Sequence, residues 1–390
     1  GILPIAAAAR RDHSARLLFP AANIAEAAIV DGLALFAVKS LFEAAQVFSA
    51  ERPEPSSRPE AARTNVEPSS EDDLSDVSGQ LLARRALEIA AAGGHHLLLC
   101  GPPGAGKTML ARRMPGILPP LSADEALTVT TIHSIAGTLP PGAGLVSTRP
   151  FRAPHHTCSD IALVGGGANP RPGELSLAHE GVLFLDELPE FSRRAIETLR
   201  QPLESGSITI ARAARIVEFP ARITLVGAMN PCPCGYANED RRRCKCAPAV
   251  IERYRARLSG PMRDRFDLSV DVRAVPWRDW RSAVRGEPTA AVRARVVRAR
   301  AAQTTRHGVL NAQLTGAALR TACALDGAGE RLLALGARQL ELSARGVTRV
   351  LRVARTIADL NGRMAIAPGD VAEALQFRPP GHAPENRERS

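Results

Sequence analysis

Lysine is scarce in this chain, although basic residues are abundant. Three of its 50 basic side chains are lysines, at Lys39, Lys107 and Lys245. The sequence contains no run of 18 apolar residues, which excludes a membrane-spanning helix. It begins with glycine and no basic-then-apolar leader follows, so we expect that an upstream segment is missing. In a chain so poor in lysine, a lysine within a phosphate-binding pattern needs a functional explanation.

The chain is basic, but its charge is unevenly distributed. The net charge is +10, whereas residues 51–76 carry eight acidic side chains and three arginines. The surplus elsewhere indicates a polyanionic partner, nucleic acid first, unless the arginines serve only to solvate the surface. Seven cysteines, four of them close together, suit metal ligands better than a disulfide framework. These features predict a cytoplasmic protein.

Residues 101–108, Gly-Pro-Pro-Gly-Ala-Gly-Lys-Thr, match the phosphate-loop pattern of nucleotide-binding proteins. An apolar run at 97–100 precedes them as a predicted strand, and a predicted helix at 109–114 follows. Glycines let backbone N–H groups close around phosphate oxygens, and the helix N-terminus adds a favourable dipole. We expect Lys107 to reach the β- and γ-phosphates and Thr108 to bind Mg²⁺. The residues expected to contact ATP are Gly101, Pro102, Pro103, Gly104, Ala105, Gly106, Lys107, Thr108 and Met109.

A second part of this site follows a predicted strand at 182–185. Asp186 and Glu187 stand directly after its apolar residues, where a carboxylate can hold the water shell of Mg²⁺. We expect Asp186 to serve the metal and Glu187 to act as general base for the attacking water. The next predicted strand, 223–228, ends near Asn230, whose amide is placed to contact the γ-phosphate and that water.

The order of strand and helix signals predicts the fold. They alternate between residues 93 and 273, which is typical of an α/β fold with a doubly wound parallel sheet and helices on both faces. The predicted strands are 97–100, 182–185, 223–228 and 268–272. In residues 1–50 we expect strands near 17–20 and 34–38, helices at 23–32 and 40–48, and no independent core.

Composition divides the chain into five regions. The predicted regions are 1–50 as the end of an α/β domain, 51–75 as a disordered acidic linker, 76–275 as the core, 276–378 as an all-α domain and 379–390 as a disordered tail.

Six motifs carry a more specific resemblance. They are the phosphate loop, 149–167, GVLFLDELPEF at 181–191, AMNPCPCG at 228–235, SGPMRDRFDL at 259–268 and SARGVTRVLRVARTIADL at 343–360. Together they resemble the magnesium-chelatase-like AAA+ ATPases of the ComM/YifB family. The resemblance implies an AAA+ P-loop core with a helix-2 insert and a hairpin before sensor 1, followed by an all-α lid. Residues 1–50 resemble the end of that family's Lon-protease-like N-terminal domain.

The resemblance also implies roles for single residues. Asn230 resembles the sensor-1 residue, and Arg265 the arginine finger, with Arg263 as the alternative. Arg345 resembles the sensor-2 arginine that reaches the γ-phosphate of its own subunit, in preference to Arg349. Residues 76–80 resemble the segment that packs against adenine. An arginine supplied to a neighbour requires a ring, and the family implies a homo-hexamer.

Three features could contact a polymer. Residues 207–212 and 215–219 predict a β-hairpin, and Arg212 and Arg215 beside its tip are candidates for DNA phosphate contacts, unless they only solubilise it. Five arginines between 288 and 307 form a stripe that would bind DNA or face water. His155 and His156 resemble metal ligands only weakly, because Cys158 is the sole further ligand nearby.

Four cysteines, Cys232, Cys234, Cys244 and Cys246, have the spacing C-x-C-x9-C-x-C. Four thiolates satisfy tetrahedral Zn²⁺, and no position is left for water, so such a zinc ion would be structural. Free structural or redox-labile thiols are the alternative.

These observations predict an AAA+ ATPase motor that hydrolyses ATP with Mg²⁺. The family implies movement on DNA, as a branch-migration helicase in recombination during natural transformation. Two alternatives remain, a chelatase motor subunit that drives metal insertion into a porphyrin and an ATPase that remodels proteins.

Overall fold

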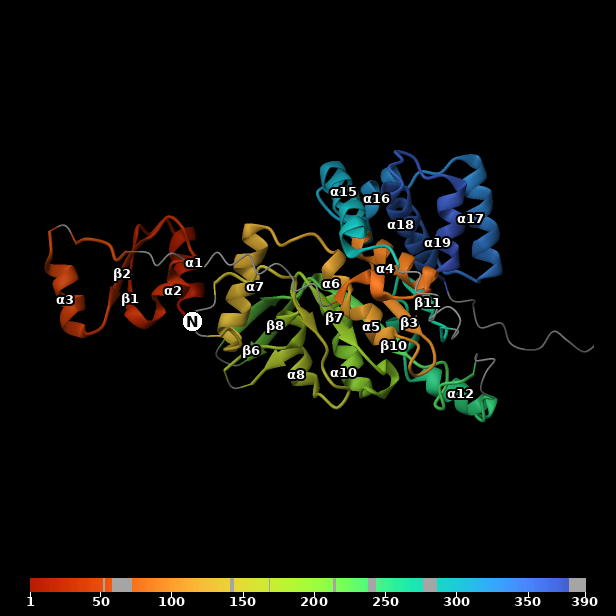
Figure 1. Cartoon of the computed structure of the whole chain (residues 1–390), viewed down its shortest axis with the longest axis horizontal. Helices are drawn as coiled ribbons and strands as arrows, with labels where there is room; N and C mark the ends of the chain where they lie inside the picture. The colour runs from red at the N-terminus through yellow and green to blue at the C-terminus, as the bar shows by residue number, and fades with distance from the viewer. Residues whose placement is uncertain are drawn as a thin grey trace, which may run out of the picture.

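The computed structural model describes residues 1–51, 53–57, 72–140, 144–167, 169–212, 215–237, 243–275 and 286–378. Figure 1 shows three regions, with an N-terminal unit at one end, a sheet-containing core in the middle and a group of helices packed on the core. Within the described stretches, no helix is both long enough and apolar enough to cross a membrane.

A five-stranded parallel sheet forms the core, in the order β11-β3-β10-β7-β4. Its strands are β3 (Leu97–Cys100), β4 (Phe151–Arg152), β7 (Val182–Leu185), β10 (Thr224–Met229) and β11 (Leu268–Asp271). The predicted α/β class is confirmed, and four of these strands are the predicted apolar runs. The fifth, β4, is too short to leave an apolar pattern in the sequence.

Both faces of the sheet are buried, which explains why its strands are apolar throughout. Leu97 and Leu99 point into one hydrophobic cluster, and Leu98 between them points into the other. The helices on the first face are α4 (Leu81–Gly93), α5 (Lys107–Arg112) and α6 (Met114–Ile117). Those on the second are α8 (Asp160–Val164), α9 (Glu174–Leu177), α10 (Arg193–Thr198), α11 (Arg200–Ser205), α12 (Pro248–Ala256) and α13 (Gly260–Arg263).

The C-terminal region is helical, as predicted. Its helices are α15 (Thr289–His307), α16 (Gly316–Ala322), α17 (Gly327–Gln339), α18 (Ala344–Leu360) and α19 (Pro368–Gln376). Helices α15 and α18 pack on α4, so one hydrophobic cluster runs from the sheet into this region. The lid is therefore joined to the core by shared apolar packing.

The arginine stripe of α15 neither faces water as a whole nor forms a free basic surface. Arg293 donates to the carbonyl of Gly116, and Arg300 donates to the carbonyl of Ala91. The remaining bonded arginines pair with acids of other elements, Arg295 with Glu88 and Glu287, and Arg306 with Asp359. Four of the five arginines thus bond to groups on other elements, which inspection of the helix alone cannot find, whereas Arg298 is exposed.

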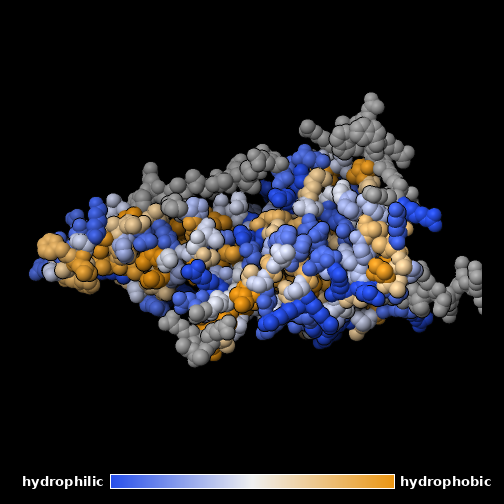
Figure 2. All heavy atoms as spheres, turned by 90° about the horizontal axis from the view of Figure 1, so that it is seen from below, coloured by the Kyte–Doolittle hydropathy of each residue, from blue (hydrophilic) through white to orange (hydrophobic). Residues whose placement is uncertain are grey.

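The N-terminal unit has a small core, contrary to the expectation. It contains α1 (Leu3–Arg11), β1 (Arg16–Pro20), α2 (Ile24–Ala27), β2 (Ala34–Val38) and α3 (Leu41–Ser49). Leu3, Phe19 and Leu35 form its cluster, against which Leu127 of α7 (Ala123–Ala136) packs. The helix predicted at 23–32 is reduced to α2 after a short 3-10 turn. Apolar side chains also gather on the surface of this unit (Figure 2), and Leu41 is 91% exposed.

The end of the predicted linker is ordered. Leu74 is buried, and its N–H donates to Thr289 Oγ1 over 2.8 Å. The Asp73 carboxylate caps a 3-10 turn at Leu74–Asp76. The packed core therefore begins before residue 76, whereas 58–71 lie outside the described residues.

The predicted hairpin consists of β8 (Ser207–Arg212) and β9 (Arg215–Pro220), which pair antiparallel. Beside it lie β5 (Gly165–Gly166) and β6 (Arg171–Pro172), also antiparallel. A Cβ added to Gly165 would lie 3.3 Å from Ile210 Cδ1, so the hairpin and the 150–167 segment touch. The tip, 213–214, and the side chains of Arg212 and Arg215 lie outside the described residues.

Candidate ATP site

The phosphate loop joins β3 to α5 and depends on its glycines. Gly104 and Gly106 have φ values of 76° and 91°, a region that favours glycine. A Cβ on Gly101 would lie 2.1 Å from the carbonyl oxygen of Val272. Pro103 and Gly104 are exposed at the turn of the loop, whereas Pro102 and Ala105 are buried. The loop therefore presents its backbone at the carboxyl edge of the sheet.

Lys107 lies within this loop and is largely buried. Its Nζ donates to the carbonyls of Gly101 and Pro102 over 2.7 and 2.9 Å, and to Asn230 Oδ1 over 3.1 Å. Burial lowers the pKa of Lys107, although the charge of Asp186 acts in the opposite direction. The structure thus brings the predicted lysine and the predicted amide together, from two neighbouring strands.

Thr108 and the acidic pair meet at the same edge. The Thr108 hydroxyl donates to Asp186 Oδ2 over 2.8 Å, and the N–H of Glu187 donates to Asp186 Oδ1 over 2.9 Å. Hydroxyl and carboxylate oxygens of this kind are suitable Mg²⁺ ligands. Glu187 has the unusual φ of 50°, and its carboxylate lies 3.2 Å from Nδ1 of His156. Sequence inspection considered His156 only as a metal ligand, and the contact with Glu187 was missed.

The segment expected to pack against adenine also reaches the loop. The Gln80 side-chain amide donates to the carbonyl of Ala105 over 3.3 Å and to that of Arg273 over 2.5 Å. Met109, the last expected nucleotide contact, is partly exposed at the start of α5. Gln80, the last residue of this segment, therefore lies beside the phosphate loop.

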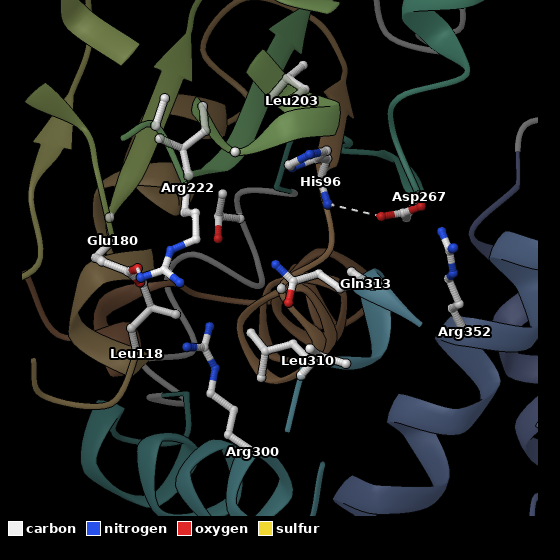
Figure 3. A pocket seen from close by; sticks show the side chains of 18 of the residues that line it. His96, Leu118, Glu180, Leu203, Arg222, Asp267, Arg300, Leu310, Gln313 and Arg352 are labelled. Atoms are coloured by element: carbon white, nitrogen blue, oxygen red, sulfur yellow. Dashed lines mark hydrogen bonds and ion pairs between the residues drawn. The ribbon is translucent and has the colours of Figure 1, made fainter. Parts of the chain in front are cut away.

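The two predicted phosphate-binding arginines lie elsewhere. Arg265 and Arg345 line a cavity of about 1280 Å³, together with His96, Gly181 and Thr224. These last three residues stand at the amino ends of β3, β7 and β10. The cavity therefore opens at the amino edge of the sheet, opposite the phosphate loop. Figure 3 shows His96, Arg222 and Arg300 around it.

This placement corrects one expectation. Arg345 was expected to reach the γ-phosphate of its own subunit, but it lies at the edge opposite Lys107. The reason is the position of α18, which packs on α4 and directs its N-terminus toward the amino edge. Arg349 is buried and pairs with Asp264 and Asp267 over 3.6 Å, whereas Arg345 is exposed. Arg345 is thus the freer of the two arginines.

The cavity is rich in charge. Its seven arginines exceed its five carboxylates, and Arg265 pairs with Glu204 of α11. Arg222 pairs with Glu180, and the two point toward each other in Figure 3. Burial lowers the pKa of Arg300 to about 10. Arg263, the alternative finger, is not among the residues that line this cavity.

The four cysteines come together as a tetrahedral metal site requires. Their Sγ atoms all lie within 4.8 Å of one another, with 3.3 Å between Cys232 and Cys234 and 3.5 Å between Cys234 and Cys244. Zn–S bonds of about 2.3 Å imply sulfur separations of about 3.8 Å. The donor set and spacing therefore fit a structural Zn²⁺. In the described stretches, no group containing His155 or His156 has such an arrangement.

This cysteine loop lies directly against the phosphate loop. A Cβ on Gly235, which has φ 87°, would lie 2.5 Å from Pro103 Cδ. The N–H of Gly235 donates to the carbonyl of Cys232 over 2.9 Å, so the contact belongs to the cysteine turn itself. Sequence spacing predicted the cluster but not this neighbour.

The fold and this site define an AAA+-type core with a helical lid. The family profile for magnesium chelatase, subunit ChlI, matches residues 73–280, and the profile for the ChlI C-terminal region matches 286–378. The chain belongs to the magnesium-chelatase-like family, in its ComM/YifB group.

Its relatives support this assignment. Competence protein ComM of Haemophilus influenzae is 42% identical over 381 residues, covering 97% of this chain and 74% of that protein. YifB of Escherichia coli is 48% identical over 311 residues, covering 78% of this chain and 60% of that protein. The magnesium-chelatase 38 kDa subunit of Rhodobacter capsulatus is 27% identical over 176 residues, covering 40% and 50%.

Proposed function

We propose that this protein hydrolyses ATP with Mg²⁺ in sites completed between neighbouring subunits of a ring, a homo-hexamer by family resemblance. The observation that carries the proposal is the split of the predicted site. Lys107, Asp186 and Asn230 meet at the carboxyl edge of the sheet, whereas Arg265 and Arg345 lie at the amino edge. A head-to-tail ring brings one edge against the other.

In such a site the two edges have different tasks. The phosphate loop and Lys107 bind the phosphates, and Thr108 and Asp186 would hold Mg²⁺, which would supply positive charge to the phosphates. Glu187 accepts the proton of the attacking water, and Asn230 contacts that water. Arg265 and Arg345 of the neighbouring subunit balance the charge that develops on the transferred phosphoryl group.

The substrate that we propose is DNA, on which the motor acts as a branch-migration helicase in recombination and natural transformation. The basic net charge, the β8–β9 hairpin with Arg212 and Arg215, and the similarity to competence protein ComM support it. The arginine stripe of α15 does not add support for DNA binding, because four of its five arginines bond to groups of the same chain. We place the protein in the cytoplasm, where its cysteines, all unpaired, suit a reducing environment.

The Cys232, Cys234, Cys244 and Cys246 cluster is proposed to hold a structural Zn²⁺, because four thiol sulfurs at these separations match its preferred donors. The residues would remain thiolates and stabilise the turn that carries Gly235. A chelatase motor remains the second candidate function, favoured by the family profile.

The test is the ATPase rate in the presence of single-stranded, duplex and four-way-junction DNA across a salt series. Glu187→Gln serves as the control that binds ATP without turnover. Stimulation by branched DNA that fades with salt is the expected result, because phosphate contacts release counterions. A basal rate that no DNA changes would contradict the DNA proposal and favour a protein or chelatase partner.

A further inference from the structure

The chain segment that follows α19 lies along the edge strand of the sheet. Strand β11 is the outermost strand, and the N–H of Ser269 donates to the carbonyl of Phe377 over 2.8 Å. Phe377 is fully buried in the hydrophobic cluster that joins the core to the lid. The end of the lid is therefore fixed beside the start of β11, shortly after Arg265 in the sequence.

Arg378 holds the loop that carries Arg265. Its Nη1 donates to the carbonyl of Phe266 over 3.2 Å and to that of Asp267 over 3.1 Å. These two residues come directly after Arg265. Hydrogen bonds from a charged guanidinium are stronger than those from a neutral donor, so the backbone of the loop is held by the lid at this point.

A second lid arginine braces the same loop. Arg349 of α18 is 7% exposed, and its guanidinium lies 3.6 Å from the carboxylates of Asp264 and Asp267. These two acids stand on either side of Arg265 in the sequence. From the core, the N–H of His96 donates to the Asp267 carboxylate over 3.4 Å. The loop is therefore fixed between the lid and the core.

The side chain of Arg265 is held less firmly than its backbone. It pairs with Glu204, whose side chain is 60% exposed. The Nε of Arg265 is buried and has no hydrogen-bond partner among the described residues. The place of this guanidinium therefore depends chiefly on the backbone that carries it. Such a dependence matters for turnover, because a misplacement of about 1 Å can lower a reaction rate about a hundredfold.

We propose that Arg378 is a positioning residue that sets the place of Arg265 for the neighbouring subunit. The inference rests on the proposed ATP hydrolysis between subunits, in which Arg265 balances charge on the neighbour's transferred phosphoryl group. Arg378 acts through the carbonyls of Phe266 and Asp267, and not on the nucleotide. The lid of one subunit thereby controls turnover in the site of the next subunit.

The first test is a loss of turnover without a loss of ATP binding. Arg378→Gln lowers kcat roughly tenfold and leaves the affinity for a non-hydrolysable ATP analogue unchanged, because the phosphate loop lies at the opposite edge of the sheet. Arg338→Gln, which removes an exposed arginine of α17, is the matched control and keeps the full rate. Urea unfolding of each variant shows whether its fold is intact.

Mixed rings then show at which edge of the sheet the defect lies. A one-to-one mixture of Arg378→Gln and Lys107→Ala is roughly two- to threefold more active than Arg378→Gln alone, because about a quarter of the interfaces join an intact phosphate loop to a well-placed finger. A mixture of Arg378→Gln and Arg265→Ala is about half as active as Arg378→Gln alone, because both changes damage the same edge.

Two results would overturn the inference alone. One is an unchanged kcat in Arg378→Gln, and the other is the reverse order of the two mixtures, which would place the effect of Arg378 in its own subunit's site. Arg378→Lys keeps the charge and one donor, loses less activity, and takes the place of Arg378→Gln in the same mixtures if that variant does not fold. If Lys107→Ala and Arg265→Ala do not complement each other in verified mixed rings, the proposed shared site fails, and the inference fails with it.

Discussion

Lys107 and Arg265 lie at opposite edges of one parallel sheet. Lys107 follows the carboxyl end of β3, and Arg265 precedes the amino end of β11, the strand paired beside it. Both residues have the chemistry of phosphate ligands, but one chain cannot bring them to the same phosphate. An arginine finger supplied by a neighbour resolves this separation.

Mixing inactive subunits tests that arrangement. Arg265→Ala and Lys107→Ala are each expected to lose ATPase activity, and a one-to-one mixture is expected to recover part of it. About a quarter of the interfaces then join an intact phosphate loop to an intact finger. A mixture of Arg345→Ala and Lys107→Ala should also recover part of the ATPase activity, because Arg345 lies at the same edge as Arg265.

Two controls make the mixing experiment decisive. Lys107→Ala mixed with Glu187→Gln should stay inactive, because both changes damage the carboxyl edge and every interface remains defective. Arg263→Ala alone should keep most of its activity, since Arg263 does not line the cavity with Arg265. If verified mixed rings of Arg345→Ala and Lys107→Ala stay inactive while the Arg265 mixture recovers, Arg345 acts within its own subunit.

The features that could be predicted from the sequence are those that depend on local chemistry, namely the buried strands and the phosphate loop. Strands β3, β7 and β10 are buried on both faces, so their apolar runs are recognisable, and the phosphate loop requires its glycines in a fixed order. Strand order is different, because no local pattern places the two-residue β4 beside β7. The contact between His156 and Glu187 depends on that order, and was therefore missed.

Long-range packing explains the other failures. Arg345 was assigned to its own site because the motif does not say where α18 lies relative to the sheet. The arginines of α15 were treated as a free surface because their partners, Glu88 and Asp359 among them, belong to other helices. Both of these errors concern the position of one element against another, and neither concerns the type of element.

The contact between Gly235 and Pro103 predicts that the cysteine cluster supports nucleotide binding. Cys244→Ser should lower the zinc content and weaken binding of a fluorescent ATP analogue, since the turn that meets Pro103 loses its anchor. Gly235→Ala should retain zinc but weaken binding of the ATP analogue roughly three- to tenfold, because the added Cβ would overlap Pro103.

Cys158→Ser is the matched control, because Cys158 lies outside the cluster. Metal content is measured on the purified protein by mass spectrometry, and affinity by titration. Full zinc content in Cys244→Ser would contradict the metal site. Unchanged affinity in Gly235→Ala, with normal zinc, would contradict the coupling between the two loops and leave the metal site standing.

His179 predicts how stability depends on pH. It is buried, and its Nδ1 accepts the N–H of Arg222 over 3.0 Å, which requires that nitrogen to be unprotonated. Burial, then the charge of Arg222, lowers its pKa to about 4. The unfolded chain therefore takes up the proton first, and stability is lost as the pH falls from about 6.5 toward 4.

The matched variant is His179→Asn, whose side-chain oxygen can accept the same N–H without titrating. Between pH 7 and pH 5 we expect the original protein to lose about 2 kcal/mol more unfolding free energy than this variant, as measured by urea unfolding. The variant removes only this titration, so other acid-sensitive groups cancel in the comparison. An equal loss in both proteins would show that His179 is protonated in the folded state, and that the cavity edge beside Glu180 admits the charge.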